Sequence, residues 1–378
     1  MIKRAILSKI LERMFKGKLI IIYGARQTGK TTLLREVQKK YKNSIWLNCD
    51  EPDVRAQLEN ATSSALKRLI GNARVVFIDE AQRVLNIGLT LKIMYEMGGN
   101  YQIVATGSSS FDLSNKISEP LTGRYFSYKL YPLSTGEILS DTGYLEYNRL
   151  FSDLLIYGHY PDIVNSSQDR EQLLIFLTSS YMYKDIFTFQ DIRRTDIIEK
   201  LLRVLALQVG GEVSINELSS LIGADRGTIS RYISLLESTF IIFGLGALTG
   251  NQRKEISKMK KIYFYDNGIR NALISNFKPL ELRSDIGQLW ENFVISERIK
   301  YNQNMGRYPN KYFWRTRSGS EVDYIEEMNG KLEGFEIKYG ANAKIRGGGK
   351  AFLSSYPGSD LHLINRENHL NYLSENVD

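Results

Sequence analysis

The stretch KLIIIYGARQTGKTTLL, residues 18–34, decides the fold that we expect. It reads as a buried strand, a glycine-bounded loop and the start of a helix, with the G-x-x-x-x-G-K-[ST] spacing of a phosphate-binding loop. In such a loop the glycines permit close backbone approach, and the amides and the helix N-terminus face an anion. Lys30 can reach the β- and γ-phosphates, and the Thr31 hydroxyl can ligate Mg²⁺. A chance match is the alternative, but the flanking strand and helix favour an ATP site made of Gly24, Ala25, Arg26, Gln27, Thr28, Gly29, Lys30, Thr31 and Thr32.

The length and composition of the chain fit a globular protein. Its 378 residues, 43% hydrophobic and 24% charged, suit two or three domains. The formal net charge of +8 favours an acidic partner such as DNA, although many basic proteins bind no nucleic acid. The single cysteine, Cys49, excludes an internal disulfide and fits a reducing compartment, so we expect a cytoplasmic protein. No run approaches the roughly 20 apolar residues of a membrane span, so we expect no membrane partner.

Residues 1–150 are expected to form an α/β domain with a parallel sheet covered on both faces, because short β-rich runs alternate with helical ones. Ligands of such sheets bind at the carboxyl ends of the strands. The candidate strands are Leu19–Tyr23, Ser44–Asn48, Arg74–Ile78, Gln102–Thr106 and Tyr125–Leu130.

Three further features of this domain are candidate parts of the ATP site. The run VVFIDE, residues 75–80, ends in two acids: Asp79 would hold Mg²⁺, and Glu80 would act as general base on the attacking water. A solvated turn after a buried strand is the alternative. Ser108, at the end of the fourth strand, can sense the γ-phosphate or simply cap a helix. Arg124 can approach the phosphates in cis, or in trans as an arginine finger, or be a plain surface arginine.

The middle of the chain is expected to be helical. Residues 151–209 read as a helical connector, and residues 210–275 as a winged helix-turn-helix, with a turn at Gly223 and a helix capped by Asp225. In that helix Ile229, Ile233 and Leu236 would face inward, and Arg226, Ser230 and Arg231 outward. Residues 251–261 hold five basic residues and one acid, which suits a wing on a DNA backbone, although winged helices on ATPases also pack against protein.

The last segment, residues 276–378, carries a hairpin signal. Asn329-Gly330 between β-like runs favours a two-residue type I′ turn. That turn would place Asp323 opposite Glu336 and Glu321 opposite Lys338, with all four on one face. The other face would then hold Val322, Tyr324, Phe335 and Ile337 in the core.

Opposed carboxylates destabilise a hairpin unless a cation offsets them, so Asp323 and Glu336 are candidate ligands of a divalent metal. An Asp followed by Glu-x-Lys across a hairpin resembles the PD-(D/E)xK nuclease fold, in which Lys338 would be catalytic. The stretch LWENFVISE, residues 289–297, resembles the first helix of that fold, with Glu291 as a further metal ligand. The alternative is a solvated polar face whose charges are offset by Lys338 and nearby arginines.

The order of these motifs resembles an AAA-type ATPase of the additional-strand, catalytic-glutamate division. The stretches YPLSTGE, residues 131–137, and YGHYP, residues 157–161, are similar to a bacterial and archaeal branch that carries a C-terminal domain of unknown function 4143. His159 stands where this branch usually has a second glycine. The resemblance implies a P-loop NTPase sheet, a helical connector and winged helix, and an α+β nuclease-like domain, and ring-forming relatives make a homo-oligomer conceivable.

The sequence therefore predicts an ATPase, with ATP and Mg²⁺ as cofactors, that is coupled to DNA binding and to Mg²⁺-dependent DNA cleavage. Its alternative is an ATP-dependent regulator or assembly factor whose nuclease-like domain is catalytically silent. A third reading, a transcription regulator, would require one specific DNA site that resists salt better than non-specific binding does.

Overall fold

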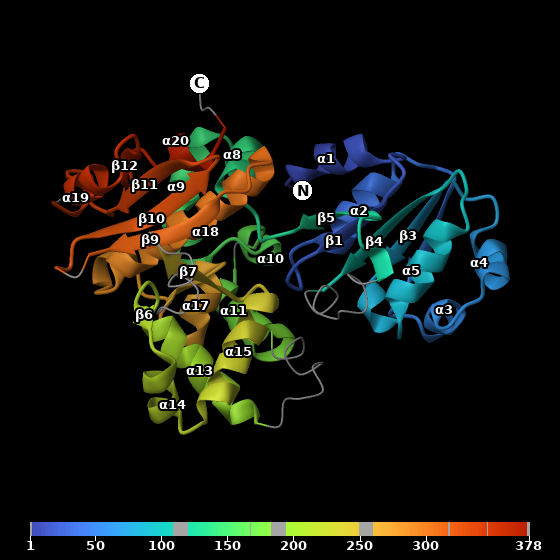
Figure 1. Cartoon of the computed structure of the whole chain (residues 1–378), viewed down its shortest axis with the longest axis horizontal. Coiled ribbons are helices and arrows are strands. Elements are labelled where there is room, and N and C mark those ends of the chain that lie inside the picture. Colours follow the sequence, from blue (N-terminus) through green and yellow to red (C-terminus); the bar gives the residue numbers. More distant parts are fainter. Residues whose placement is uncertain are drawn as a thin grey trace.

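The computed structural model describes residues 2–108, 120–166, 168–182, 194–248, 260–316, 318–345 and 347–375. Figure 1 shows two bodies side by side, one made from the first third of the chain and one from the rest. Among the described helices, none combines the length and the apolar character that crossing a membrane requires.

The first body is a parallel five-stranded sheet with the strand order β2-β3-β4-β1-β5. Every residue of β1 and β3 is buried, as expected for strands covered on both faces. Side chains alternate across the sheet, so Ile20 and Ile22 pack toward α1 and α2, while Ile21 packs with Leu66 and Leu91 from α4 and α5. The elements are α1 (Ile6–Arg13), β1 (Leu19–Tyr23), α2 (Lys30–Gln38), β2 (Ser44–Asn48), α3 (Pro52–Leu58), α4 (Ser63–Ile70), β3 (Val75–Asp79), η1 (Ala81–Arg83), α5 (Ile87–Glu96), β4 (Gln102–Gly107) and β5 (Tyr125–Lys129).

The second body is built on a mixed seven-stranded sheet with the order β12-β11-β10-β9-β7-β8-β6. Its strands are β6 (Glu212–Val213), β7 (Ile242–Ala247), β8 (Lys260–Phe264), β9 (Asn310–Arg315), β10 (Glu321–Met328), β11 (Lys331–Ile337) and β12 (Asp360–Ile364). Its helices are α8 (Thr135–Thr142), α9 (Tyr144–Tyr157), α10 (Pro161–Val164), α11 (Arg170–Phe176), the π-helical η2 (Leu177–Met182), α13 (Thr195–Leu207), α14 (Ile215–Ile222), α15 (Arg226–Ser238), α17 (Asn267–Leu273), η3 (Leu280–Leu282), α18 (Ile286–Met305), α19 (Gly347–Ser355) and α20 (Leu370–Leu373). The chain therefore folds as the expected α/β sheet, helical region and second sheet.

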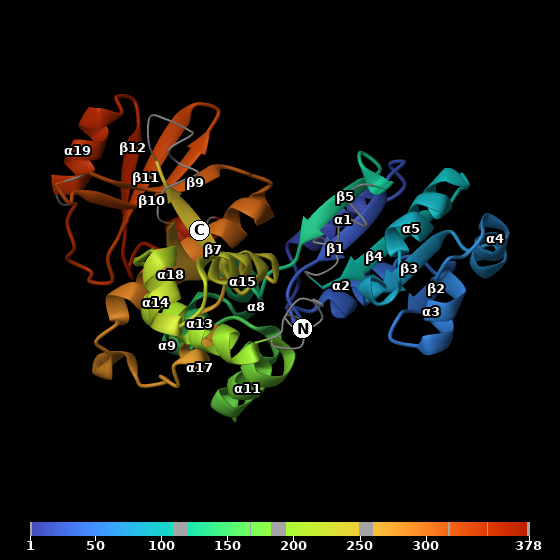
Figure 2. The same ribbon diagram turned by 60° about the horizontal axis from the view of Figure 1, so that its bottom comes forward.

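The segment from α13 to β8 follows the order helix, strand, helix, helix, strand, strand. The Asp225 carboxylate accepts a hydrogen bond from the Thr228 amide at 2.9 Å and caps α15, as predicted. Figure 2 shows α13, α14 and α15 at the front, below the sheet. As the helical pattern predicted, the apolar face of α15 is buried and holds Ile229, Ile233 and Leu236. Its polar face is exposed and holds Arg226, Ser230 and Arg231. Most of the basic segment at 251–261, residues 251–259, lies outside the described residues.

One strand joins the two segments that the sequence treats as separate domains. β7 pairs with β8 in antiparallel fashion and, further along, with β9 in parallel fashion at Gly246 and Ala247. Residues 210–275 and 276–378 therefore share one sheet. Helix α9 also packs with this body, since the side-chain amides of Asn267 and Asn271 donate to the carbonyl oxygens of Leu155 and Ile156.

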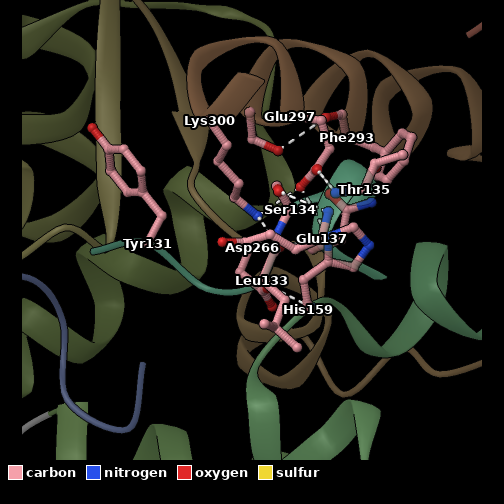
Figure 3. A network of polar contacts seen from close by, with 12 residues as sticks. Tyr131, Leu133, Ser134, Thr135, Glu137, His159, Asp266, Phe293, Glu297 and Lys300 are labelled. Carbon is pink, nitrogen blue, oxygen red and sulfur yellow. Dashed lines mark hydrogen bonds and ion pairs between the residues drawn. The ribbon is translucent and has the colours of Figure 1, made fainter. Parts of the chain in front are cut away.

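A buried carboxylate holds the start of the second body together (Figure 3). Glu297 of α18 is only 1% exposed. Its oxygens accept hydrogen bonds from the Thr135 amide at 2.6 Å and from Lys300 Nζ at 2.6 Å, and they lie 2.9 Å from His159 Nδ1. Lys300 Nζ and His159 Nδ1 also reach the Leu133 carbonyl oxygen. The stretches at 131–137 and 157–161 thus meet at one anion.

Asp266, the N-cap of α17, completes the junction. Its carboxylate accepts a hydrogen bond from the His159 amide at 2.7 Å, and a Cβ on Gly158 would lie 2.0 Å from Asp266 Oδ1. Gly158 therefore has to be glycine, whereas the next position has room for the imidazole of His159.

We expect Glu297→Gln to destabilise the protein by about 3 kcal/mol at pH 7, because Lys300 would lose its buried partner. Burial alone would raise the pKa of Glu297, but Lys300 and His159 lower it well below its usual range. A lowered folded-state pKa adds stability above the unfolded carboxyl pKa of about 4.3, and that stability is lost as the pH falls below it. Denaturant unfolding from pH 8 to 3 should show the gap between wild type and variant closing on acidification.

The control for this experiment is Glu281→Gln, which removes an exposed carboxylate from η3. It should change the free energy of unfolding by less than about 0.5 kcal/mol. A Glu297→Gln gap that is constant with pH would contradict the charged network.

Candidate functional site

The phosphate-loop sequence forms the predicted turn between β1 and α2. Gln27 and Gly29 have left-handed backbone angles, with φ of 58° and 90°. Lys30 is 5% exposed, and its Nζ donates hydrogen bonds to the carbonyl oxygens of Gly24 at 3.0 Å and Ala25 at 2.9 Å. The ammonium group therefore lies at the centre of the loop, where the β- and γ-phosphates of a nucleotide would be held. Ala25 and Thr28 are buried, Arg26, Gln27 and Gly29 are half-buried, and Thr31 and Thr32 are exposed at the start of α2.

Gly24 serves backbone packing as well as ligand approach. A Cβ at this position would lie 2.1 Å from the Leu130 carbonyl oxygen. The Leu130 amide donates to the Tyr23 carbonyl oxygen at 2.7 Å, so the chain leaving β5 is held against the first residue of the loop. The sequence pattern explained Gly24 by the phosphate alone and gave no sign of this contact.

Asp79 and Thr31, the predicted Mg²⁺ ligands of the first body, come together. Asp79 ends β3 and is 4% exposed, and its carboxylate accepts a hydrogen bond from the Thr106 hydroxyl on β4. Burial raises the pKa of Asp79, while hydrogen bonds from Thr106 and Thr31 and the charge of Lys30 act against that rise. A carboxylate and a hydroxyl beside a phosphate loop fit Mg²⁺, which binds through one or two protein oxygens and completes its shell with water and phosphate.

Glu80 and Ser108 are linked by a residue that the sequence did not single out, Gln82. Its amide nitrogen donates to Glu80 Oε2 at 2.5 Å, and its Oε1 accepts from the Ser108 amide at 3.2 Å. Glu80 has a left-handed φ of 53°, and its amide donates to the Thr106 hydroxyl. Strained backbone of this kind is common where a side chain must be aimed at a ligand. The only sign of this role in the sequence was that a glutamine, Gln82, stands two residues after Glu80.

Arg4 connects the phosphate loop to the second body, and the sequence analysis missed it. Its guanidinium donates to the carbonyl oxygens of Thr28 and Tyr131, both at 2.7 Å, and to Glu137 Oε1 at 3.0 Å. Glu137 is also the third residue of α8, where it forms a capping box with Ser134. These partners lie 24 to 133 residues from Arg4 along the chain, so no local pattern could reveal them.

Arg124 lies at the end of the first sheet that is opposite to the phosphate loop. Its carbonyl oxygen accepts from the amide of Leu19, the first residue of β1, whereas the phosphate loop follows the last residue of that strand. The guanidinium pairs with Glu96 at 3.3 Å. A cis contact between Arg124 and the phosphates does not fit this arrangement, which leaves the trans role as a proposal.

The register of the C-terminal hairpin is as predicted, and its apolar face is as predicted for Tyr324, Phe335 and Ile337 but not for Val322. Met328 pairs with Lys331 and Tyr324 with Phe335 around a turn with φ of 55° and 79°. Val322, however, packs with Trp314, Ile325 and Phe352 rather than with Tyr324, Phe335 and Ile337. The cause is an irregularity in the pairing of β10 with β9 between Val322 and Ile325, since one inserted residue turns the following side chains to the other face.

The predicted metal ligands of this hairpin have separate partners. Asp323 accepts hydrogen bonds from the Ile337 amide at 2.7 Å and Lys338 Nζ at 2.8 Å. Glu336 instead approaches the start of α19, where a Cβ on Gly349 would lie 2.7 Å from its Oε1.

Glu291 of α18 lies close enough to Asp323 for their charges to interact. It accepts from the Tyr263 hydroxyl at 2.7 Å and lies 3.6 Å from Lys261 Nζ, and burial followed by the charge of Asp323 raises its pKa to about 7. Among the described residues, no group of three or more carboxylate, histidine or cysteine side chains is placed to hold a metal ion. The metal set of Glu291, Asp323 and Glu336 therefore stays a prediction.

Comparisons with protein families agree with the two bodies. Residues 16–139 match the family model described as AAA domain, residues 148–280 match domain of unknown function 8612, and residues 286–374 match domain of unknown function 4143. The first body thus carries the AAA domain that the P-loop motifs predicted. The last part of the chain carries the predicted domain of unknown function 4143.

The similar curated proteins are themselves uncharacterized. One from Haemophilus influenzae is 24% identical over 81% of this chain and 81% of its own length. One from Mycobacterium tuberculosis is 26% identical over 89% of this chain and 74% of its own length. One from Methanocaldococcus jannaschii is 25% identical over 85% and 75%, respectively.

Among solved structures, the Aeropyrum pernix ORC1 protein in complex with DNA covers 72% of this chain and 91% of its own, at 15% identity and a TM-score of 0.30. CDC6P from Pyrobaculum aerophilum covers 72% and 94%, at 12% identity and a TM-score of 0.27. TM-scores of this size do not establish a shared overall arrangement.

We expect Gly24→Ala to destabilise the protein by about 3 kcal/mol, because its Cβ would collide with a backbone carbonyl that cannot move alone. Gly287→Ala is the matched control: its Cβ meets nothing within 4 Å at the start of α18. That change should alter stability by less than about 1 kcal/mol. Thermal unfolding of both variants measures the two losses of stability. An equal loss in Gly24→Ala and Gly287→Ala would contradict a collision with the Leu130 carbonyl oxygen.

Proposed function

We propose that the protein is an ATP-binding and ATP-hydrolysing switch whose turnover is coupled to DNA binding. The observation that carries the ATPase part is the meeting of five side chains at one edge of the first sheet. They are Lys30 and Thr31 from the phosphate loop, Asp79 and Glu80 from the end of β3, and Gln82, which reaches the end of β4.

Each of these groups has a role in the proposed reaction. The loop amides and Lys30 would bind the β- and γ-phosphates, since the start of α2 adds its positive dipole there. Mg²⁺ held by Thr31 and Asp79 would neutralise charge on the phosphates. Glu80 would accept the proton of the attacking water. Gln82 would position Glu80 against Ser108, and Arg124 would act on the site of a neighbouring copy.

The DNA part is supported by charge and by the surface of α15. The net charge is +8, and Arg226, Ser230 and Arg231 are exposed on one helix in a segment with the element order of a winged helix. Exposed arginines on such a helix can bind DNA phosphates.

DNA cleavage receives no support from the geometry of the hairpin. Asp323 is paired with Lys338, and Glu291 shares Lys261 with Glu321, so protein cations already lie beside the carboxylates that a metal would bind. We therefore favour a C-terminal domain that is catalytically silent. Incubating the protein with DNA, ATP and Mg²⁺ or Mn²⁺ tests this point, and cleavage that Asp323→Ala abolishes would overturn it.

Lys30→Ala should lower ATP turnover by at least about 100-fold, because it removes the charge beside the transferred phosphoryl group. Steady-state phosphate release with and without DNA is the measurement. Lys40→Ala, which removes an exposed lysine beyond α2, is the control and should keep wild-type turnover. Normal turnover in Lys30→Ala would refute the site assignment. A wild-type turnover rate that does not change when DNA is added would refute the coupling.

Glu80→Gln should bind ATP with wild-type affinity but hydrolyse it at least about 100-fold more slowly, since an amide cannot take the proton from water. Equilibrium binding of a fluorescent ATP analogue and single-turnover hydrolysis separate the two steps. A variant that hydrolyses ATP at the normal rate would exclude the general-base role.

A further inference from the structure

A pocket with positive walls lies between the two bodies, and its lining includes Tyr23, the residue directly before the phosphate loop. Its volume is about 340 Å³. One wall comes from α1 and from β5, the edge strand of the first sheet, and the other from the end of α18 and residues 307–311. Gln303 ties the walls together, because its side chain donates to the Lys129 carbonyl oxygen and its own carbonyl oxygen accepts from Lys9 Nζ.

The charges in this pocket are one-sided. Lys9, Lys129, Arg307 and Lys311 line it, and no aspartate or glutamate does. Arg307 faces Glu326 and Glu333 at 3.8–3.9 Å. Within the described part of the chain, no carboxylate lies within 4.0 Å of the three lysine ammonium groups.

Two of these lysines, Lys129 and Lys311, repel each other, while Glu326 partly offsets the charge of Lys311. Desolvation lowers the pKa of Lys311, and the charge of Lys129 lowers it further. An ammonium group has three donors, and the Lys9 ammonium uses one of them on Gln303. Grouped cations with unused donors are costly in an isolated protein, and a bound anion offsets that cost.

The rim of the pocket adds an aromatic surface. Tyr308 is 75% exposed, directly next to Arg307 in the chain. Exposed aromatic rings beside cations are the elements that bind single-stranded nucleic acid, because each base stacks on a ring while the backbone phosphate meets a cation. A bare inorganic anion would leave Tyr308 without a role.

We propose that this pocket binds a nucleotide unit, with its phosphate among Lys9, Lys129 and Lys311 and its base against Tyr308. The unit is either a free mononucleotide or one residue of a single strand. This inference deepens the proposed DNA coupling and rests on it only for the choice of ligand. Because the walls belong to both bodies, a bound strand would also stabilise their present arrangement.

The test is equilibrium binding of fluorescent oligothymidylate of about 12 nucleotides, measured without ATP at several salt concentrations. Lys129→Gln/Lys311→Gln should weaken binding at least about tenfold and lower the slope of log affinity against log salt by about two. Tyr308→Ala should weaken it about tenfold while leaving the salt slope unchanged. Lys40→Gln/Lys42→Gln removes the same charge from exposed positions outside the pocket and should stay within about twofold of wild type.

Competition distinguishes the two sources of the ligand. Displacement of the oligonucleotide by dTMP would assign a free nucleotide, and displacement by longer strands alone would assign a strand. Equal competition by inorganic phosphate and dTMP would overturn the proposal, as would equal losses in the pocket and control variants or no binding by the wild type. Thermal unfolding shows that each variant is folded, and the outcome is independent of ATP turnover because no ATP is present.

Discussion

The buried carboxylate of Glu297 constrains the positions of the segments that supply its hydrogen-bond donors. An anion that is 1% exposed must be matched by donors, and these come from the Thr135 amide, Lys300 and His159. Since Thr135 begins α8 and the chain enters that helix directly from β5, the first sheet is attached to α18 at a fixed point. Arg4 extends the constraint to the phosphate loop through Glu137 and the Thr28 carbonyl oxygen. These contacts link the phosphate loop to α18 through Arg4, Glu137 and the start of α8.

The two acidic regions of the protein differ in what neutralises them. At the end of β3, Asp79 meets hydroxyl groups and the single charge of Lys30, so room remains for a cation brought in with phosphates. In the hairpin region, Asp323 pairs with Lys338, and Glu291 shares Lys261 with Glu321. Breaking such pairs to admit a metal would require the lysine charge to be moved back into water. The two regions therefore differ in how much of their negative charge is already faced by protein cations.

Local signals in the sequence predicted much of this geometry. The strand and loop at 18–34, the helix cap at Asp225 and the hairpin register at Asn329-Gly330 are each set by backbone preferences within a few residues, and the structure confirms them. The sequence did not predict the irregular pairing after Val322, because it depends on the neighbouring strand β9. Arg4 and Gln82 were missed for a related reason: their importance lies in partners that only the folded chain brings near.

The contacts of α9 bear on how the protein is made. The Ile156 carbonyl oxygen accepts from Asn271, a residue 115 positions later. At ~5–20 residues per second, the ribosome needs about 6–23 seconds to supply that partner. By then all five strands of the first sheet have been synthesised, and so has Glu137, the partner of Arg4. Helices α17 and α18, which pack against α9, follow later in the chain, so α9 can complete its packing only after they have been made.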